Sequence, residues 1–178
     1  FYCIYLTSSS TGNIIRRNVL SGRSAGIYVN SDNNAVDHNT VTDSDAGIYF
    51  YSCQNGPIYY NTLTGNARGI RLYLASAYNS SSTVRNNKMI SNGWGIELTT
   101  TSSITFRGNW LQQNTWGVSI DDGASSSNIF YDNDFVRNVA GQVTLPSGAN
   151  NTIWSQSNQG NYWSDYKGKD ANGDGIGD

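Results

Sequence analysis

An asparagine is followed by a glycine eight residues later at six places along the chain, and no other feature of the sequence constrains the fold as strongly. The pairs are Asn18 and Gly26, Asn39 and Gly47, Asn61 and Gly69, Asn87 and Gly95, Asn109 and Gly117, and Asn133 and Gly141. Successive glycines are 21, 22, 26, 22 and 24 residues apart, so the length varies only between each glycine and the next asparagine. Repeats of this length are typical of solenoids, in which each repeat buries its apolar face against its neighbours.

Each repeat carries three short apolar segments. An alternating triplet follows each glycine, as in Ile27-Tyr28-Val29, and its first and third residues are expected to point inward. We call the six asparagines and six glycines listed above the marker residues. Further apolar residues stand three positions before and two positions after each marker asparagine. Three strands per coil predict an all-β chain, folded as a right-handed parallel β-helix of about six coils. A β-sandwich is the main rival fold.

Two columns of asparagine are predicted to stack along this solenoid. One column consists of the six marker asparagines, and the second lies five residues further on, at Asn66, Asn92, Asn114 and Asn138. Each side chain is expected to hydrogen-bond to its copy in the next coil, which satisfies turn groups that would otherwise be buried unpaired. The glycine of each repeat is expected to supply a corner with a positive φ angle.

The charge balance argues against two classes of partner. Only 13% of the residues are charged, the formal net charge is -2 and the pI is about 5.2. The sequence therefore shows no basic footprint for nucleic acid or for an anionic membrane. It contains no apolar run of transmembrane length, so membrane insertion is not expected. Low charge with abundant Gly, Asn, Ser, Thr and Tyr favours an extracellular or cell-surface location.

Aromatic residues concentrate near the C-terminus and predict a cap over the last coil. They are Trp154, Tyr162, Trp163 and Tyr166. Such a cap would cover the apolar cross-section and the unpaired backbone edge of the solenoid. We therefore divide the chain into a parallel β-helix over residues 1–154 and a C-terminal cap with an acidic loop over residues 155–178.

The repeat pattern resembles a known family. Its form is N-x-[apolar], a turn of small residues and then G-[IV]-x-[apolar], and over residues 3–154 it resembles the repeats of the pectin-lyase-like superfamily, in its carbohydrate-binding and sugar-hydrolase branch. The tail, GNYWSDY at residues 160–166 and DANGDGIGD at residues 170–178, looks like the closing segment of NosD-type proteins. The resemblance implies the fold and an extracellular setting, and leaves enzyme, binder and structural element open.

NosD-type proteins are named for a role in copper-centre maturation, and a copper site of this kind would need soft ligands. The chain has one His, one Met and two Cys, and these residues do not cluster in the sequence. We therefore do not expect a copper site. Cys3 and Cys53 occupy different positions within coils two apart, so we expect free thiols rather than a disulfide.

The strongest metal signal lies at the C-terminus. Its candidate ligands alternate with other residues, at Asp170, Asn172 and Asp174, with Asp178 beyond. Oxygen ligands spaced in this way around a glycine-containing turn can wrap a hard cation, so the segment is a candidate Ca²⁺ site. The acidic residue that an EF-hand-like loop carries at its twelfth position is missing, and a solvated acidic turn is the alternative.

Tyrosines recur at outward positions of the strands that follow the glycines. They are Tyr5, Tyr28, Tyr49, Tyr51 and Tyr73. Aromatic faces flanked by hydroxyl, amide and charged groups suit stacking on sugar rings. The alternative is that these rings only pack across neighbouring strands and stabilise the sheet.

Catalysis would need acidic or basic groups at suitable spacing, and the candidates are few. Glu97 and Asp121 lie one coil and two residues apart and are the best carboxyl pair for glycoside hydrolysis. Arg71 beside Glu97 is a candidate for a lyase, although an ion pair between neighbouring coils explains both residues without catalysis.

The leading hypothesis is a non-enzymatic extracellular module that binds a polysaccharide through the tyrosine face, with a calcium-stabilised C-terminal loop. The second is a structural protein of a sheath, surface layer or filament, in which copies associate end to end through open β-helix ends. A polysaccharide lyase or hydrolase is the third.

Overall fold

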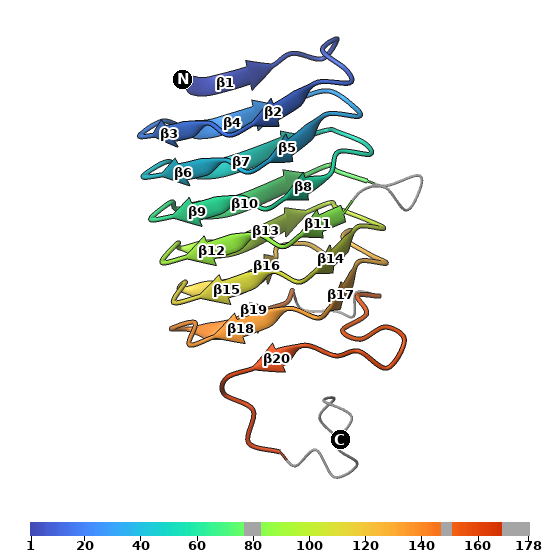
Figure 1. The fold of residues 1–178 in the computed structure, drawn as a ribbon. Helices are drawn as coiled ribbons and strands as arrows, with labels where there is room; N and C mark the ends of the chain where they lie inside the picture. Colours follow the sequence, from blue (N-terminus) through green and yellow to red (C-terminus); the bar gives the residue numbers. More distant parts are fainter. Residues whose placement is uncertain (77–82, 147–150, 169–178) are drawn as a thin grey trace.

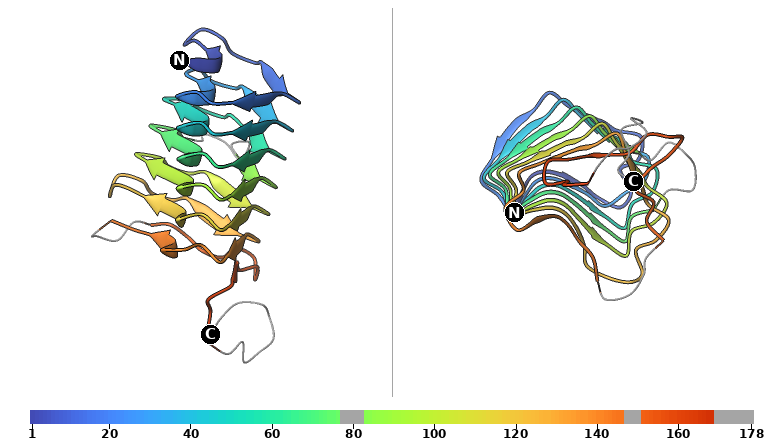
Figure 2. Two further views of the ribbon diagram at one scale, coloured as in Figure 1. Left: turned by 90° about the vertical axis from the view of Figure 1, so that its left-hand side faces the viewer. Right: turned by 90° about the horizontal axis from the view of Figure 1, so that it is seen from below.

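The computed structural model describes residues 1–76, 83–146 and 151–168, and it confirms the predicted all-β right-handed parallel β-helix. Twenty strands form three parallel sheets that run the length of the molecule, with one strand of each sheet per coil (Figure 1). Seen from the C-terminal end, the chain runs counter-clockwise as it approaches the viewer, which is the right-handed sense (Figure 2). The described residues contain no helix, and thus no helix that could cross a membrane.

Sheet A contains the strands that follow the marker glycines. They are β1 (Tyr2–Leu6), β4 (Ala25–Val29), β7 (Ala46–Tyr51), β10 (Arg68–Tyr73), β13 (Trp94–Thr99), β16 (Trp116–Ile120) and β19 (Gly141–Thr144). Every neighbouring pair is parallel and in the register that the repeat predicted; Ile70, for example, lies beside Ile48 on one side and Ile96 on the other.

Sheets B and C flank the corner at which each marker asparagine lies. Sheet B contains β2 (Ile14–Arg16), β5 (Ala35–Asp37), β8 (Ile58–Tyr59), β11 (Thr83–Arg85), β14 (Thr105–Arg107) and β17 (Ile129–Tyr131). Sheet C contains β3 (Val19–Ser21), β6 (Thr40–Thr42), β9 (Thr62–Thr64), β12 (Lys88–Ile90), β15 (Trp110–Gln112), β18 (Asp134–Val136) and β20 (Tyr162–Trp163). In the view along the axis, sheet A forms the side of the molecule opposite this corner (Figure 2).

One continuous apolar core fills the solenoid. The inward positions of the three sheets form columns of like residues, including Ile48, Ile70 and Ile96 from sheet A and Leu63, Met89 and Leu111 from sheet C. Aromatic rings continue the stacking toward the C-terminus, where Phe106 and Phe130 lie parallel with centroids 4.2 Å apart. The outer residues of each alternating triplet therefore point inward, as predicted.

The first asparagine ladder forms as predicted, and Asn87 shows its chemistry. The Oδ1 atom of Asn87 accepts hydrogen bonds from the backbone N–H and the Nδ2 of Asn61, at 2.9 and 3.0 Å. Its Nδ2 donates to Oδ1 of Asn109 at 3.1 Å and to the carbonyl of Ile58 at 3.0 Å. All of these groups are buried, so the ladder satisfies corner backbone groups that have no strand partner.

The second ladder is also confirmed and joins neighbouring coils at the corner between sheets C and A. The Nδ2 atoms of Asn66, Asn92 and Asn114 each donate to Oδ1 of the next asparagine in the column, which ends at Asn138. Nδ2 of Asn138 donates to Oε1 of Gln142, which closes the column.

A partial third ladder lies five residues before the markers and was not predicted. The backbone N–H and the Nδ2 of Asn13 donate to Oδ1 of Asn34, at 2.8 and 3.0 Å. In the later coils Oδ1 of Asn128 accepts from the backbone N–H of Ile104. Because only some coils carry asparagine here, the column is harder to find in the sequence; the constant distance of five residues to the next marker is the signal that reveals it.

The predicted role of the marker glycines is wrong for five of the six, since only Gly141, with a φ of 158°, has a positive angle. Gly47, Gly69 and Gly95 do not have positive φ angles. They are required because the coils approach closely: a Cβ atom on Gly95 would lie 2.6 Å from the carbonyl oxygen of Gly117 and 3.0 Å from Cδ2 of Leu111. The glycine therefore makes room for the next coil and for the core residue beside it.

The left-handed corners fall instead on the residue before each ladder position. Before the first ladder they are Arg17, His38, Tyr60, Asn86, Gly108 and Asp132, and before the second they are Gly22, Asp43, Gly65, Ser91, Gln113 and Arg137. Their φ angles lie between 51° and 68°. Non-glycine residues occupy this conformation at a cost, which the ladder hydrogen bonds of the following residue help to offset.

The C-terminal cap forms with two of its four predicted residues. Trp154 stacks on Phe130 with a centroid distance of 4.7 Å, and Trp163 stacks on Phe135 at 4.4 Å, so both indoles extend core columns. Tyr162, which precedes the inward-facing Trp163 on β20, and Tyr166 are both exposed. The first ladder continues past residue 154 to Asn161, and the boundary between β-helix and cap at 154 stays a prediction.

Both cysteines are free, as expected. Cys3 is exposed near the N-terminal end, whereas Cys53 is buried two residues after the end of β7. The Cys53 thiol donates to the carbonyl of Val29 at 2.9 Å, and burial raises its pKa to about 11. Cys53 therefore behaves as a small core residue.

The close approach of the coils predicts the effect of a single methyl group. Gly95→Ala should destabilise the protein by about 1–3 kcal/mol, because backbone and core atoms of the next coil must move to admit the Cβ atom. Gly123→Ala is the matched control, since a Cβ atom there would meet nothing within 4 Å. Urea denaturation measures both, and equal stabilities for the two variants would contradict the packing role.

The ladder predicts a larger effect for an asparagine. Asn87→Ala should cost more than about 2 kcal/mol, because the backbone N–H of Asn61 and the carbonyl of Ile58 lose their side-chain partner inside the protein. Asn30→Ala, outside the ladders, should change stability by less than about 0.5 kcal/mol. The free energy of unfolding from denaturant titration decides, and similar values for both substitutions would exclude a special role for the ladder.

Candidate functional site

The predicted tyrosine columns exist on the outer face of sheet A. Tyr5, Tyr28 and Tyr49 lie side by side in consecutive coils, and Tyr51 lies beside Tyr73 in the next column. The outward positions of the following coils hold Arg71, Glu97 and Ser119. Sheet A therefore has an aromatic half toward the N-terminus and a charged half beyond it.

The tyrosine rings pack on one another, so they are not equally available to a ligand. Tyr28 is only 9% exposed, because four tyrosine rings pack on it. Their centroids lie 4.5 Å (Tyr2), 5.0 Å (Tyr49), 5.2 Å (Tyr5) and 6.3 Å (Tyr51) from its own. Tyr51 and Tyr73 are half-buried and parallel, with centroids 5.4 Å apart and 2° between their planes. Tyr5 is 51% exposed at the N-terminal end. Tyr28 thus supports the face from within, and the other four rings present surface.

Burial changes the acidity of the central rings. Loss of hydration is the main cause that raises the pKa of Tyr28 to about 12, and the neighbouring tyrosines add to it. Burial also raises the pKa of Tyr49, although the nearby charge of Arg71 opposes the effect. The Arg71 guanidinium lies over the Tyr49 ring, 4.8 Å from its centroid, and links the aromatic and charged halves of the face.

Glu97 is the centre of the charged half. Its carboxylate accepts a hydrogen bond from Nε of Arg68 at 2.9 Å, and Nε of Arg71 lies 2.7 Å from Oε2 in an ion pair that is not aligned as a hydrogen bond. Arg68 also pairs with Asp45 at 2.8 Å. The two guanidinium groups lie against both of its oxygens and shield it from solvent, so only 4% of Glu97 is exposed.

This arrangement does not place the catalytic candidates as a reacting pair. Glu97 is enclosed by arginines, whereas Asp121 is exposed and its Oδ1 lies next to the Ser119 hydroxyl. A general acid has to reach the glycosidic oxygen, and the buried Glu97 carboxylate offers no such access. The ion pair between Arg71 and Glu97 in neighbouring coils, which the sequence suggested as the non-catalytic alternative, is present.

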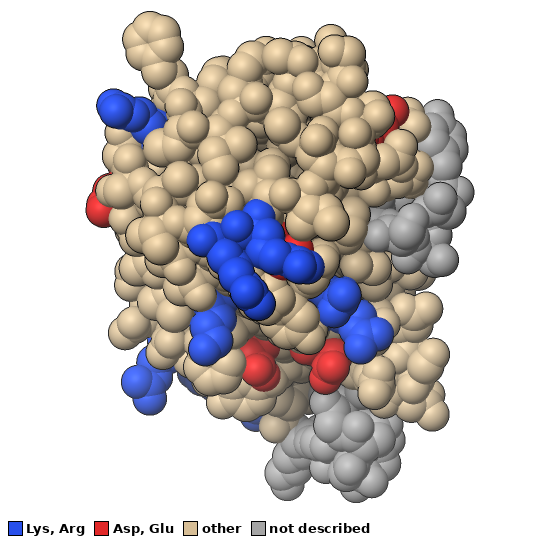
Figure 3. Space-filling model, turned by 45° about the horizontal axis from the view of Figure 1, so that its top comes forward, with Lys and Arg blue, Asp and Glu red and all other residues tan. Residues whose placement is uncertain are grey.

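The charges of the opposite side of the molecule are arranged differently. Figure 3 shows Lys and Arg side chains gathered over the middle of the face that sheets B and C form. The outward positions there include Arg85 and Arg107 on sheet B and Lys88 on sheet C. The sequence-based expectation of no basic footprint considered only the net charge, and the fold concentrates part of the positive charge on one face.

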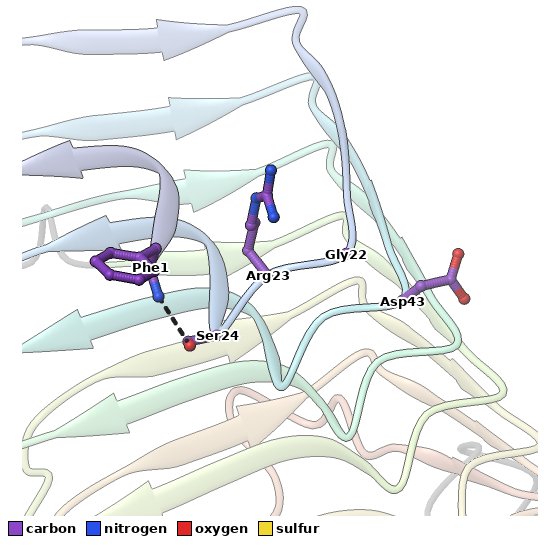
Figure 4. A pocket seen from close by; sticks show the side chains of 5 residues that line it. All are labelled: Phe1, Gly22, Arg23, Ser24 and Asp43. Carbon is purple, nitrogen blue, oxygen red and sulfur yellow. Dashed lines mark hydrogen bonds between the residues drawn. The ribbon is translucent and has the colours of Figure 1, made fainter.

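Two other parts of the chain are candidate sites. Phe1, Gly22, Arg23, Ser24 and Asp43 line an open hollow near the N-terminal end, where the Phe1 amino group donates to the Ser24 hydroxyl at 3.1 Å. Figure 4 shows the Arg23 and Asp43 side chains pointing in different directions, so the hollow has no convergent polar groups. The candidate Ca²⁺ ligands Asp170, Asn172, Asp174 and Asp178 lie outside the described residues, and that site stays a prediction.

The soft side chains do not fit a copper site in the described part of the chain. Met89 is fully buried in the core, and Cys53 is buried and hydrogen-bonded to backbone carbonyls. His38 lies at a surface corner, where its Nδ1 is 2.7 Å from Oδ1 of the buried Asp37. Among residues 1–76, 83–146 and 151–168, no three His, Cys, Asp or Glu side chains group as metal ligands. A copper centre cannot be built from these residues as they lie.

Two comparisons identify relatives of this chain. A family model described as "Periplasmic copper-binding protein (NosD)" matches residues 2–168. A protein of Stutzerimonas stutzeri named "Probable ABC transporter binding protein NosD" is 29% identical over 147 residues, which make up 82% of this chain and 26% of that protein. The chain therefore spans about a quarter of the length of that relative.

The raised pKa of Tyr28 predicts how stability depends on alkaline pH. In the unfolded chain the phenol ionises near its ordinary value of 10.0, whereas in the fold it stays protonated up to about 12. The unfolded state thus loses its proton first, and stability should fall as pH rises from 10 toward 12. Urea denaturation at about pH 9 and about pH 11 should show a smaller loss for Tyr28→Phe than for the native chain. Tyr162→Phe, at an exposed ring, is the control, and an unchanged loss in Tyr28→Phe would contradict the prediction.

Proposed function

The chain belongs to the NosD family, and from this premise and the geometry of sheet A we propose that it is a non-enzymatic module that binds polysaccharide outside the cytoplasm. The observation that carries the proposal is the tyrosine face, in which Tyr51 and Tyr73 are parallel and partly exposed, and the buried Tyr28 supports the rings around it. Rings that neighbouring side chains hold in place lose little conformational freedom when a sugar stacks on them.

The polar neighbours of these rings support a carbohydrate rather than an apolar ligand. Arg71 contacts Tyr49, and Asp121 and Thr99 lie at outward positions of the adjoining coils. Hydroxyl, carboxylate and guanidinium groups beside an aromatic surface can hydrogen-bond to sugar hydroxyls while the ring face covers the apolar side of the sugar. The face is open and extends along the solenoid axis, which suits several units of a polymer.

The proposal does not include catalysis because of the environment of Glu97. The carboxylate that would have to act as the acid or base is enclosed by Arg68 and Arg71. Binding without turnover is therefore the activity that fits the face best. The relative's name describes a transporter binding protein, and a module that holds a ligand for a larger assembly is consistent with that name.

A substitution at the edge of the tyrosine face tests the proposal. Tyr73→Ala should weaken binding to any glycan that the native chain retains on an oligosaccharide array by about tenfold, because it removes one of two stacked rings. Tyr162→Ala is the control, since Tyr162 is an exposed tyrosine on the last strand of sheet C. An array without hits, or equal affinities for both variants in calorimetry, would reject the tyrosine face as a glycan site.

A further inference from the structure

A second surface lies on the other side of the molecule, around the corner that joins sheets B and C. Arg85 and Lys88 flank this corner in one coil, and Arg107 and Trp110 flank it in the next. The register places Arg85 beside Arg107 and Lys88 beside Trp110. Since adjacent strands are about 4.8 Å apart, the backbones of the two residues in each pair are close. We call these four residues, which flank one corner in two neighbouring coils, the basic corner.

The positive charges of the basic corner are not neutralised within the described residues. Arg85 lies over the rings of Tyr59 and Tyr60, with its guanidinium carbon 4.7 and 5.7 Å from their centroids, and Arg107 lies 5.8 Å from the Tyr131 ring. No described carboxylate is within ion-pair distance of Arg85, Lys88 or Arg107. Nη1 of Arg107 also donates to the Tyr131 hydroxyl at 3.4 Å. A guanidinium group carries five N–H donors, so both arginines keep N–H groups for an incoming anion.

The arginines of sheet A show the contrast. Arg68 and Arg71 both pair with Glu97, and Arg68 also pairs with Asp45, so their charges serve the fold. Acidic residues in the neighbouring coils could neutralise the basic corner in the same way, because an outward position has neighbours in the coils on either side. It places tyrosines beside Arg85 and Arg107 instead. Asp134, which follows Trp110 in the register, marks the end of the basic surface.

A hollow beside these charges provides an aromatic platform. Lys88, Ile90, Trp110 and Gln112 line it. The indole of Trp110 is 38% exposed, and its Nε1 donates to Oε1 of Gln112 at 3.0 Å, which fixes the ring. An exposed, fixed indole next to an ammonium group and an amide is a surface on which one sugar ring can stack and be hydrogen-bonded.

We propose that the basic corner binds an acidic polysaccharide, with a sugar ring on Trp110 and its acid groups held by Arg85, Lys88 and Arg107. Guanidinium groups bind carboxylates in a bidentate manner, and three uncompensated cations match a polymer with about one charge per sugar. Nucleic acid fits less well, because its affinity comes from many phosphate contacts and the chain as a whole carries a net charge of -2. The site is separate from the tyrosine face of sheet A and does not depend on it.

The test uses polygalacturonate as the acidic probe and its fully methyl-esterified form as the neutral one. Binding of the whole chain is measured by calorimetry at low and high salt. The native chain should bind polygalacturonate, less tightly at high salt, and bind the methyl ester at least about tenfold more weakly. Arg85→Gln with Arg107→Gln, and separately Trp110→Ala, should each reduce the affinity for polygalacturonate by at least about tenfold.

Arg23→Gln with Arg137→Gln is the matched control, because it removes two charges at the corner between sheets C and A and should leave binding unchanged. Thermal unfolding verifies that all variants are folded. Tyr73→Ala should also leave polygalacturonate binding intact, which separates this site from the tyrosine face. Unchanged binding in the Arg85 and Arg107 variant, equal binding of the methyl ester, or binding of a single-stranded oligonucleotide in place of polygalacturonate would overturn the proposal.

Discussion

The hydrogen bond from one asparagine to its copy in the next coil is the interaction on which the rest of the structure depends. An asparagine side chain both donates and accepts, so an identical residue can satisfy it above and below without introducing charge. Asn87 does this and also holds backbone groups of Asn61 and Ile58. Because each ladder fixes the distance between coils at a corner, the eight residues from marker asparagine to glycine cannot change in length. Insertions are confined to the connection between sheets A and B.

That constraint separates the residues that determine the fold from those available for binding. Inward and corner positions are occupied by apolar residues, asparagines and glycines in coil after coil, whereas outward positions are free to differ along each column. The outward positions of sheet A hold packed tyrosines and a buried carboxylate that pairs with two arginines. At the corner between sheets B and C the outward positions hold cations that have no acidic partner among the described residues. The two faces of the scaffold therefore differ in chemistry, which is why we propose a different ligand for each.

The repeat spacing was sufficient to predict the sheets, their register and two of the ladders, because these features follow from periodicity alone. The predicted role of Gly95 was wrong. Glycine is required there because a carbonyl of the next coil leaves no room for a Cβ atom, and not because of the backbone angles of Gly95. The burial of Tyr28 at its outward position was not predicted, because four large rings close over it. The basic corner was missed because net charge averages over all faces. In each case the deciding contact joins residues more than 20 positions apart, and sequence composition carries no information about it.

The fold that the NosD family shares and the copper binding named in its description require different residues. The NosD match extends over residues 2–168, the range in which the ladders and the core columns recur, and these features require asparagine, glycine and apolar residues. Copper binding requires soft ligands that converge on one point, whereas Met89 faces the core and His38 lies at a surface corner next to Asp37. A β-helix can keep its coils while the outward residues change, because no ladder passes through an outward side chain. The ligand of this chain is therefore to be sought from its own outward surfaces, and the family's description is the weaker guide.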